Sequence, residues 1–190
     1  MTVATWFGLA WGVWSLSWGL ASFWSARTVA SSKTPGAYGT RVGLGLGAVV
    51  ALVGGIHPWP LSAPLWRVGD AAVTVLAVVL VSGFALCWWA RLYLGALWSS
   101  SIGRKEGHRV VDTGPYALVR HPIYAGLILS AAAVALAVAT PLTFAGVALF
   151  IASIWRRAAL EEAFLSRELG PAYDDYRRRV PMLVPFLPPG

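Results

Sequence analysis

The chain has 190 residues, of which 57% are hydrophobic and only 12% are charged, and it contains 11 Trp. Soluble globular proteins carry about twice this share of charged residues, so the composition excludes that class and indicates an integral membrane protein. The net charge of +7 then has to be explained first by where basic residues lie relative to a membrane.

Three segments are apolar over close to the length that crosses a hydrocarbon core, which takes about 20 helical residues. They are residues 3–24, 42–56 and 71–90. A fourth apolar region, residues 123–155, is too long for one span and is interrupted at Thr140 and Pro141. Because proline removes a backbone donor and restricts the residue before it, we expect a turn there. The sequence therefore predicts an all-α integral membrane protein with about five transmembrane helices, the last two forming a short helical hairpin.

We expect one integrated membrane domain, in which residues 1–97 form helices 1–3 and residues 98–190 form helices 4–5 with the functional region. Gly8 and Gly12, and then Gly43 and Gly47, have the four-residue spacing that lets membrane helices approach closely. We interpret these glycines as packing positions. The single cysteine, Cys87, has no partner for a disulfide or for a cysteine-based metal site, and we expect no metal.

The basic residues predict the orientation of the helices. If the N-terminus lies outside, every Lys and Arg except Arg67 falls on the inner side, which agrees with the positive-inside rule. The inner set is Arg27, Lys33, Arg41, Arg91, Arg104, Lys105, Arg109, Arg120, Arg156, Arg157, Arg167, Arg177, Arg178 and Arg179. Topology and contact with anionic membrane lipids therefore explain the net charge, and we expect no nucleic-acid partner.

Polar chemistry concentrates in the second half of the chain. A polar connection, residues 104–109, contains His108, and the run 114–126 then places Arg120 and His121 directly before Pro122 and a long apolar segment. Pro122 suits the first position of a helix, so the side chains of Arg120 and His121 should lie at the N-terminal end of that helix. Free backbone donors and the positive end of the helix dipole would face an incoming anion there.

A second polar group follows the predicted hairpin. Arg157 and Glu161 are four residues apart and share a helix face, and Glu162 is adjacent. Two neighbouring carboxylates at a membrane surface could hold a cation, and the arginine one turn earlier could hold an anion. In isolation, however, Arg157 with Glu161 is better explained as an exposed ion pair, and Arg120 is better explained as an anchor to lipid headgroups.

Together these residues resemble the isoprenylcysteine carboxyl methyltransferase family over about residues 98–186. The resemblance rests on the ordered set Gly114, Pro115, Tyr116, Arg120, His121, Pro122, Tyr124, Gly126, Arg157, Glu161, Glu162, Leu165, Gly170, Tyr173 and Tyr176. It implies a membrane enzyme that binds S-adenosylmethionine in a cytosolic pocket formed by the loop before helix 4 and the segment after helix 5. The implied cofactor-binding residues are His108, Tyr116, Val119, Arg120, His121, Tyr124, Glu161 and Glu162, and the implied catalytic residues are Arg157 and Glu161.

The implied reaction transfers a methyl group to a lipophilic or amphipathic acceptor, and a carboxylate acceptor fits best. A carboxylate is already ionised at neutral pH and needs no general base, whereas an amine acceptor would need one, for which His108 or a glutamate is a candidate. The Ala, Val, Gly and Arg bias of the chain suggests a bacterial source, and hence the inner membrane, with the active site in the cytoplasm.

Other functions stay open at this stage. Relatives with a similar second half include phospholipid or amine N-methyltransferases and NADPH-dependent sterol reductases. A reductase is disfavoured because Glu161 and Glu162 would repel the phosphates of a nicotinamide cofactor. A scaffold or transporter is disfavoured because the predicted helices contain almost no ionisable residue that would mark a substrate path.

Overall fold

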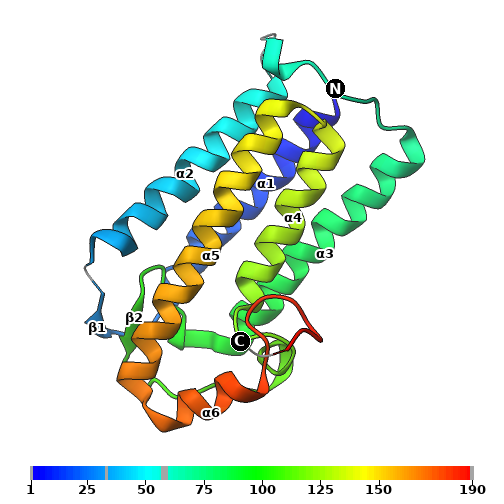
Figure 1. Cartoon of the computed structure of the whole chain (residues 1–190). Coiled ribbons are helices and arrows are strands. Elements are labelled where there is room, and N and C mark those ends of the chain that lie inside the picture. Colours follow the sequence, from blue (N-terminus) through cyan, green and yellow to red (C-terminus); the bar gives the residue numbers. More distant parts are fainter. Residues whose placement is uncertain (1, 33, 57–59, 189–190) are drawn as a thin grey trace.

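The computed structural model of the chain describes residues 2–32, 34–56 and 60–188, so Lys33 of the predicted inner-side set lies outside the described residues. Five helices of 17 or more residues dominate the fold. They are α1 (Val3–Ala21), α2 (Pro35–Ile56), α3 (Asp70–Leu94), α4 (Pro122–Val138) and α5 (Pro141–Leu169). Figure 1 shows that they run side by side along one direction, with the N-terminus at one end of the bundle.

The opposite end of the bundle carries the smaller elements (Figure 1). These are β1 (Thr28–Ser31), β2 (Gly103–Lys105) and α6 (Pro171–Arg179). The two strands pair in antiparallel fashion, with Thr28 opposite Lys105. The Lys105 side chain donates to the Ala26 carbonyl and to the Thr28 hydroxyl, both at 2.9 Å. This small sheet was not predicted, because strands this short carry no measurable alternation of polar and apolar residues.

The helices have the lengths and surfaces of membrane helices. Three among the described residues are long and apolar enough to cross a bilayer, namely Pro35–Gly55, Asp70–Leu97 and Pro141–Leu169, and Pro122–Val138 is a shorter apolar helix. Large apolar side chains such as Leu16, Val49 and Val78 are exposed on their outer faces. Such a surface is stable in lipid and not in water, so the protein is an integral membrane protein. The number of helices that cross the membrane completely remains a prediction.

The predicted hairpin turn is present between α4 and α5. Ala139 adopts a left-handed conformation with φ of 57° and ends α4, and Thr140 is the N-cap of α5, its hydroxyl accepting from the Thr143 amide. The same Thr140 hydroxyl donates to the Gly54 carbonyl at 3.1 Å. The turn is therefore closed by its own capping residues and is also held against the end of α2.

Two helices extend beyond their apolar segments. Helix α2 begins at Pro35 rather than at residue 42, and the Thr34 hydroxyl accepts a hydrogen bond from the Ala37 amide in its first turn. Helix α5 continues past residue 155 to Leu169 because one face of its polar half stays buried. That extension carries Arg157, Glu161 and Glu162, so the polar cluster lies on the same rigid helix as the membrane segment.

Close helix contacts depend on glycines, as predicted for two of the four positions. A Cβ atom on Gly47 would lie 2.8 Å from the Gly146 carbonyl oxygen of α5, and one on Gly43 would overlap the Ser153 side chain. For Gly12 the prediction is wrong, because none of the described residues lies within 4 Å of an added Cβ, and a Cβ on Gly8 would make only ordinary contact. The tight packing therefore joins α2 to α5, which fixes the position of the polar half of α5.

Candidate active site

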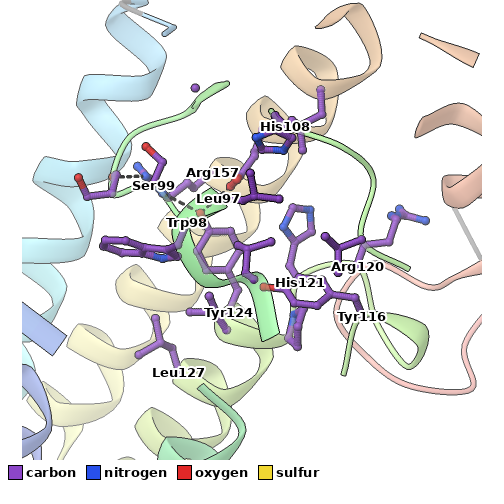
Figure 2. A pocket seen from close by; sticks show the side chains of 18 of the residues that line it. Leu97, Trp98, Ser99, His108, Tyr116, Arg120, His121, Tyr124, Leu127 and Arg157 are labelled. Carbon is purple, nitrogen blue, oxygen red and sulfur yellow. Dashed lines mark hydrogen bonds between the residues drawn. The ribbon is translucent and has the colours of Figure 1, made fainter. Parts of the chain in front are cut away.

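A cavity of about 630 Å³ lies at the end of the bundle that carries α6 and the small sheet. Part of its wall is polar and comes from the loop after β2, the start of α4 and the second half of α5. The remainder is apolar and comes from α1, α2 and the end of α3. Figure 2 shows side chains from the segment after α3, the loop after β2, the start of α4 and the second half of α5 converging on one space. The ionisable side chains in the wall are Arg41, His108, Arg109, Tyr116, Arg120, His121, Tyr124, Arg157, Glu161, Tyr173 and Tyr176.

Three of these side chains form one hydrogen-bonded array. The Tyr124 hydroxyl donates to Glu161 Oε2 at 2.7 Å and accepts from Arg157 Nε at 2.9 Å. Arg157 Nη2 donates to the Ser100 carbonyl at 2.7 Å. Arg157 is only 6% exposed, so its interpretation as an exposed ion pair with Glu161 is wrong. The array fixes the positive guanidinium and the negative carboxylate at a set separation across the tyrosine hydroxyl.

A second array lies behind the cavity wall and is centred on Glu162. Arg120 donates to both of its carboxylate oxygens, from Nε at 2.5 Å and from Nη2 at 3.2 Å. His121 Nε2 lies 3.3 Å from Oε1, without the alignment of a hydrogen bond, and Arg177 Nε lies 3.6 Å from Oε2. Glu162 is 5% exposed and does not line the cavity. This buried ion pair also rules out Arg120 as an anchor to lipid headgroups.

The C-terminal segment completes this region. Arg120 Nη1 donates to the carbonyls of Arg177 and Val180. The backbone amides of Arg120 and His121 donate to the carbonyls of Pro181 and Met182, at 2.8 and 3.1 Å. These two backbone donors, which directly precede α4, are therefore occupied and are not available to an incoming anion.

The aromatic rings at the start of α4 are stacked. His121 and Tyr124 have ring centroids 5.3 Å apart and planes inclined by 15°.

Tyr116, in the short helix η3 (Gly114–Ala117), is buried, and burial raises the pKa of its phenol. Its hydroxyl lies 3.4 Å from the Ala90 carbonyl, and its own carbonyl accepts from Tyr176 at 2.7 Å. Val119 is buried at 2% exposure and does not line the cavity.

His108 stands on the opposite wall, in the connection after β2. Its Nδ1 accepts a hydrogen bond from the Lys105 backbone amide at 3.4 Å. Burial lowers the pKa of its imidazole, with the Glu161 carboxylate acting in the raising direction and Arg104 in the lowering direction. His108 is therefore neutral at pH 7, and because Nδ1 accepts, its proton is on Nε2.

Charge in the cavity is unbalanced. Four arginines contribute to the wall, namely Arg41, Arg109, Arg120 and Arg157, and Glu161 is the one carboxylate among the described residues that line it. In the part of the chain that the structure describes, no three His, Cys, Asp or Glu side chains gather where they could hold a metal ion.

Sequence reasoning missed several residues of the wall. Trp98 and Ser100 follow the end of α3, and Trp14, Trp18 and Arg41 come from α1 and α2. The only signal in the sequence is position, since Trp14 and Trp18 lie inside the apolar segment 3–24, deeper than an interfacial tryptophan would lie. The role of Ser100 is a backbone carbonyl contact, which no residue type indicates.

Comparison with known proteins shows similarity over the part of the chain that supplies most of the polar wall of the cavity. Residues 75–167 match the sequence model of the isoprenylcysteine carboxyl methyltransferase family. The chain is 34% identical over 89 residues to a protein-S-isoprenylcysteine O-methyltransferase of Schizosaccharomyces pombe, covering 45% of this chain and 36% of that protein. It is 45% identical over 76 residues to a methanethiol S-methyltransferase of Bradyrhizobium diazoefficiens, covering 38% of this chain and 27% of that protein.

The fold is also similar to a solved structure. The structure of a eukaryotic intramembrane Ras methyltransferase, isoprenylcysteine carboxyl methyltransferase, superposes with a TM-score of 0.54 at 24% sequence identity. The match covers 82% of this chain and 54% of that one. The chain thus spans less than half the length of both curated relatives and about half of the solved structure.

Proposed function

We propose that the chain, which matches the isoprenylcysteine carboxyl methyltransferase family model over residues 75–167, belongs to that family and is a membrane methyltransferase that uses S-adenosylmethionine and modifies a lipophilic or amphipathic acceptor. One observation supports this most directly. The hydrogen-bonded array of Arg157, Tyr124 and Glu161 lines a single cavity whose wall has both polar and apolar parts. A polar cofactor and a partly apolar acceptor could meet there.

The residues of the cavity fit S-adenosylmethionine. This cofactor carries an ammonium, a carboxylate and a sulfonium, and when bound it supplies an electrophilic methyl group. Glu161 would pair with a cationic group, and one of the wall arginines would pair with the carboxylate. The stacked rings of His121 and Tyr124 offer an aromatic surface to a cation or to a planar base. A cavity of about 630 Å³ lies within the range of small-molecule sites.

Glu162 would act on the cofactor indirectly. It is buried behind the wall and bound to Arg120, so we infer that it holds Arg120 and His121 in place and leaves direct contact to Glu161. Val119 would support the same wall by packing.

Arg157 would orient the acceptor. Hydrogen bonds occupy its Nε and its Nη2, which leaves Nη1 to bind an anionic acceptor group. A carboxylate held in this way is already ionised at neutral pH and needs no base. Catalysis would then come from alignment of the two reactants and from exclusion of water, a proximity effect that contributes up to about 7 to 11 kcal/mol.

An acceptor that must lose a proton, such as an amine or a thiol, would use Glu161 rather than His108. Neutral His108 carries its proton on Nε2 and can only donate from that atom, because Nδ1 is occupied by the Lys105 amide. Glu161 can take a proton through the Tyr124 hydroxyl, which already donates to it. The names of the two curated relatives cover both a carboxyl and a thiol acceptor.

We also propose that the site faces the cytoplasm of a bacterial cell, in the inner membrane, with the N-terminus outside. The N-terminus lies at one end of the bundle, and α6 and the small sheet lie at the other (Figure 1), where their residues Gly103, Tyr173 and Tyr176 line the cavity. By the same topology, the described basic residues other than Arg67 lie on the cavity side, in connections, near helix ends or in the polar half of α5.

The experiment is calorimetric titration of the detergent-purified protein with S-adenosylmethionine, S-adenosylhomocysteine and NADPH in turn. We expect saturable binding of the two adenosyl ligands, weakened in Glu161→Gln and unchanged in Glu168→Gln. Glu168 is on the same helix but pairs with Arg104 away from the cavity wall. Binding of NADPH alone would instead support a reductase. If the folded protein binds neither the adenosyl ligands nor NADPH, both proposed enzymatic functions are contradicted.

The acceptor is then sought with a panel. Labelled S-adenosylmethionine is incubated with an isoprenylated cysteine carboxylate, a phosphatidylethanolamine and an alkanethiol. Transfer to the first supports the carboxyl reaction. Transfer only to the amine or only to the thiol would contradict the carboxyl reaction and support N-methylation or S-methylation in its place.

A further inference from the structure

Arg91 is an arginine buried in the last turn of α3, at the cavity end of the bundle. It is 0% exposed. Its Nη1 donates to the Gly95 carbonyl at 2.5 Å, and its Nη2 donates to the carbonyls of Ala21, at 2.8 Å, and Trp24. The guanidinium also lies against the rings of Trp24 and Trp98, 4.9 and 4.8 Å from their centroids.

Burial of this cation is costly, because none of the described Asp or Glu side chains forms an ion pair with it. Its partners are instead carbonyls at the C-terminal ends of α1 and α3, where the helix dipoles are negative. A fully buried ionisable side chain in a membrane protein calls for a functional explanation. The contacts of Arg91 indicate what that function is.

The contacts of Arg91 hold the segment that joins α3 to the cavity wall. Beside the guanidinium, the Ser25 hydroxyl donates to the Trp98 carbonyl at 2.8 Å and the Ala26 amide donates to the Ala96 carbonyl at 2.8 Å. Trp98 itself lines the cavity. Two residues later, the Ser100 carbonyl receives Arg157 Nη2 at 2.7 Å.

We propose that Arg91 is a positioning residue for Arg157, acting through the segment 95–100. It fastens the end of α1 and Trp98 to the end of α3, and this fixes the place of the carbonyl that orients the Arg157 guanidinium. The catalytic meaning of this role rests on the proposed methyltransferase function, in which Arg157 aligns the acceptor. The mechanical link between the two arginines does not depend on that function.

The link is tested by a double-mutant cycle in the ligand-free protein. Arg91→Met, Arg157→Met and the double variant are purified in one detergent, and the midpoint of thermal unfolding is measured for each. If Arg91 acts through the wall segment, the double variant should lose clearly less than the sum of the two single losses, because the second substitution removes a contact that is already lost. Additive losses would overturn the proposal, since they would mean that Arg91 is only a local anchor.

Arg91→Lys provides a second variant if Arg91→Met does not fold. A lysine keeps the charge but cannot contact carbonyls of two helix ends while stacking between two rings, so the same non-additivity with Arg157→Met is expected. Arg167→Met is the matched control, since Arg167 is a basic residue in the last turn of α5 with an exposed side chain. It should combine additively with Arg157→Met.

A kinetic measurement follows once an acceptor has been identified. Arg91→Lys should lower kcat by up to about 100-fold, the effect of a misplaced reacting group, with S-adenosylhomocysteine affinity changed by less than about threefold. An unchanged kcat would overturn the proposal. If the wild-type protein binds no adenosyl ligand while the cycle is non-additive, the methyltransferase function fails and the positioning of Arg157 by Arg91 stands.

Discussion

Glu162→Gln provides a direct measure of how far the buried ion pair stabilises the site. Glu162 is 5% exposed and receives two hydrogen bonds from Arg120, at 2.5 and 3.2 Å. Removal of one partner from a buried, hydrogen-bonded ion pair costs about 3–5 kcal/mol, because the other charge is left without compensation. Glutamine keeps the side-chain volume and one carbonyl acceptor, so we expect a loss near the lower limit, about 3 kcal/mol.

In a chain of this size, a loss of about 3 kcal/mol lowers the unfolding midpoint by about 6–12 °C. The assay is thermal unfolding in detergent, followed by tryptophan fluorescence. Glu168→Gln is the matched control, since Glu168 lies on the same helix and pairs with Arg104 at 3.1 Å, with side chains 29% and 41% exposed. An exposed pair contributes less than about 1 kcal/mol. Equal shifts for the two variants would refute the reasoning that Glu162 is a buried structural partner of Arg120.

Three further predictions concern other parts of the structure. Tyr124→Phe removes the hydroxyl that joins Arg157 to Glu161, and methyl transfer should fall by about 10- to 100-fold with little change in calorimetric S-adenosylhomocysteine affinity; unchanged transfer would argue against the array. Burial lowers the pKa of His108, so the unfolded state binds more protons and stability should decrease as the pH falls below about 6.5; His108→Gln should flatten that part of the midpoint curve. Gly146→Ala would place a Cβ in overlap with the Ala51 amide nitrogen and should cost about 1–3 kcal/mol, whereas Gly45→Ala, whose Cβ meets none of the described residues within 4 Å, should leave the midpoint nearly unchanged.

Hydropathy was sufficient to predict the membrane helices, because burial in lipid determines them, and Pro141 was sufficient to predict the hairpin turn. Hydropathy could not predict where α5 ends. The apolar segment stops near Trp155, but the helix continues to Leu169 because Arg157, Ala158 and Glu162 are buried against neighbouring elements. Such burial depends on tertiary contacts, which a local average of hydropathy does not detect.

The residues that carry the family resemblance include Tyr116, His121, Tyr124, Arg157 and Glu161, which all line the cavity. The resemblance could not predict which of the two adjacent carboxylates, Glu161 or Glu162, faces the cavity. Successive residues of a helix point about 100° apart, so only the rotation of α5 decides between Glu161 and Glu162. That rotation is fixed by the glycine contacts between α2 and α5. The wall contacts of Ser100, Pro181 and Met182 were equally hidden, since each is made by a backbone carbonyl.

The attachment of the C-terminal segment to the mouth of α4 has a consequence for the order of assembly. The Arg120 side chain donates to the Val180 carbonyl across 60 residues of sequence, and its backbone amide donates to the Pro181 carbonyl. During synthesis, the five long helices can therefore enter the membrane while this corner of the cavity is still open to water. The cavity is completed only when residues 180–182 leave the ribosome, so a fusion partner attached before Val3 should disturb it less than one placed close after Met182.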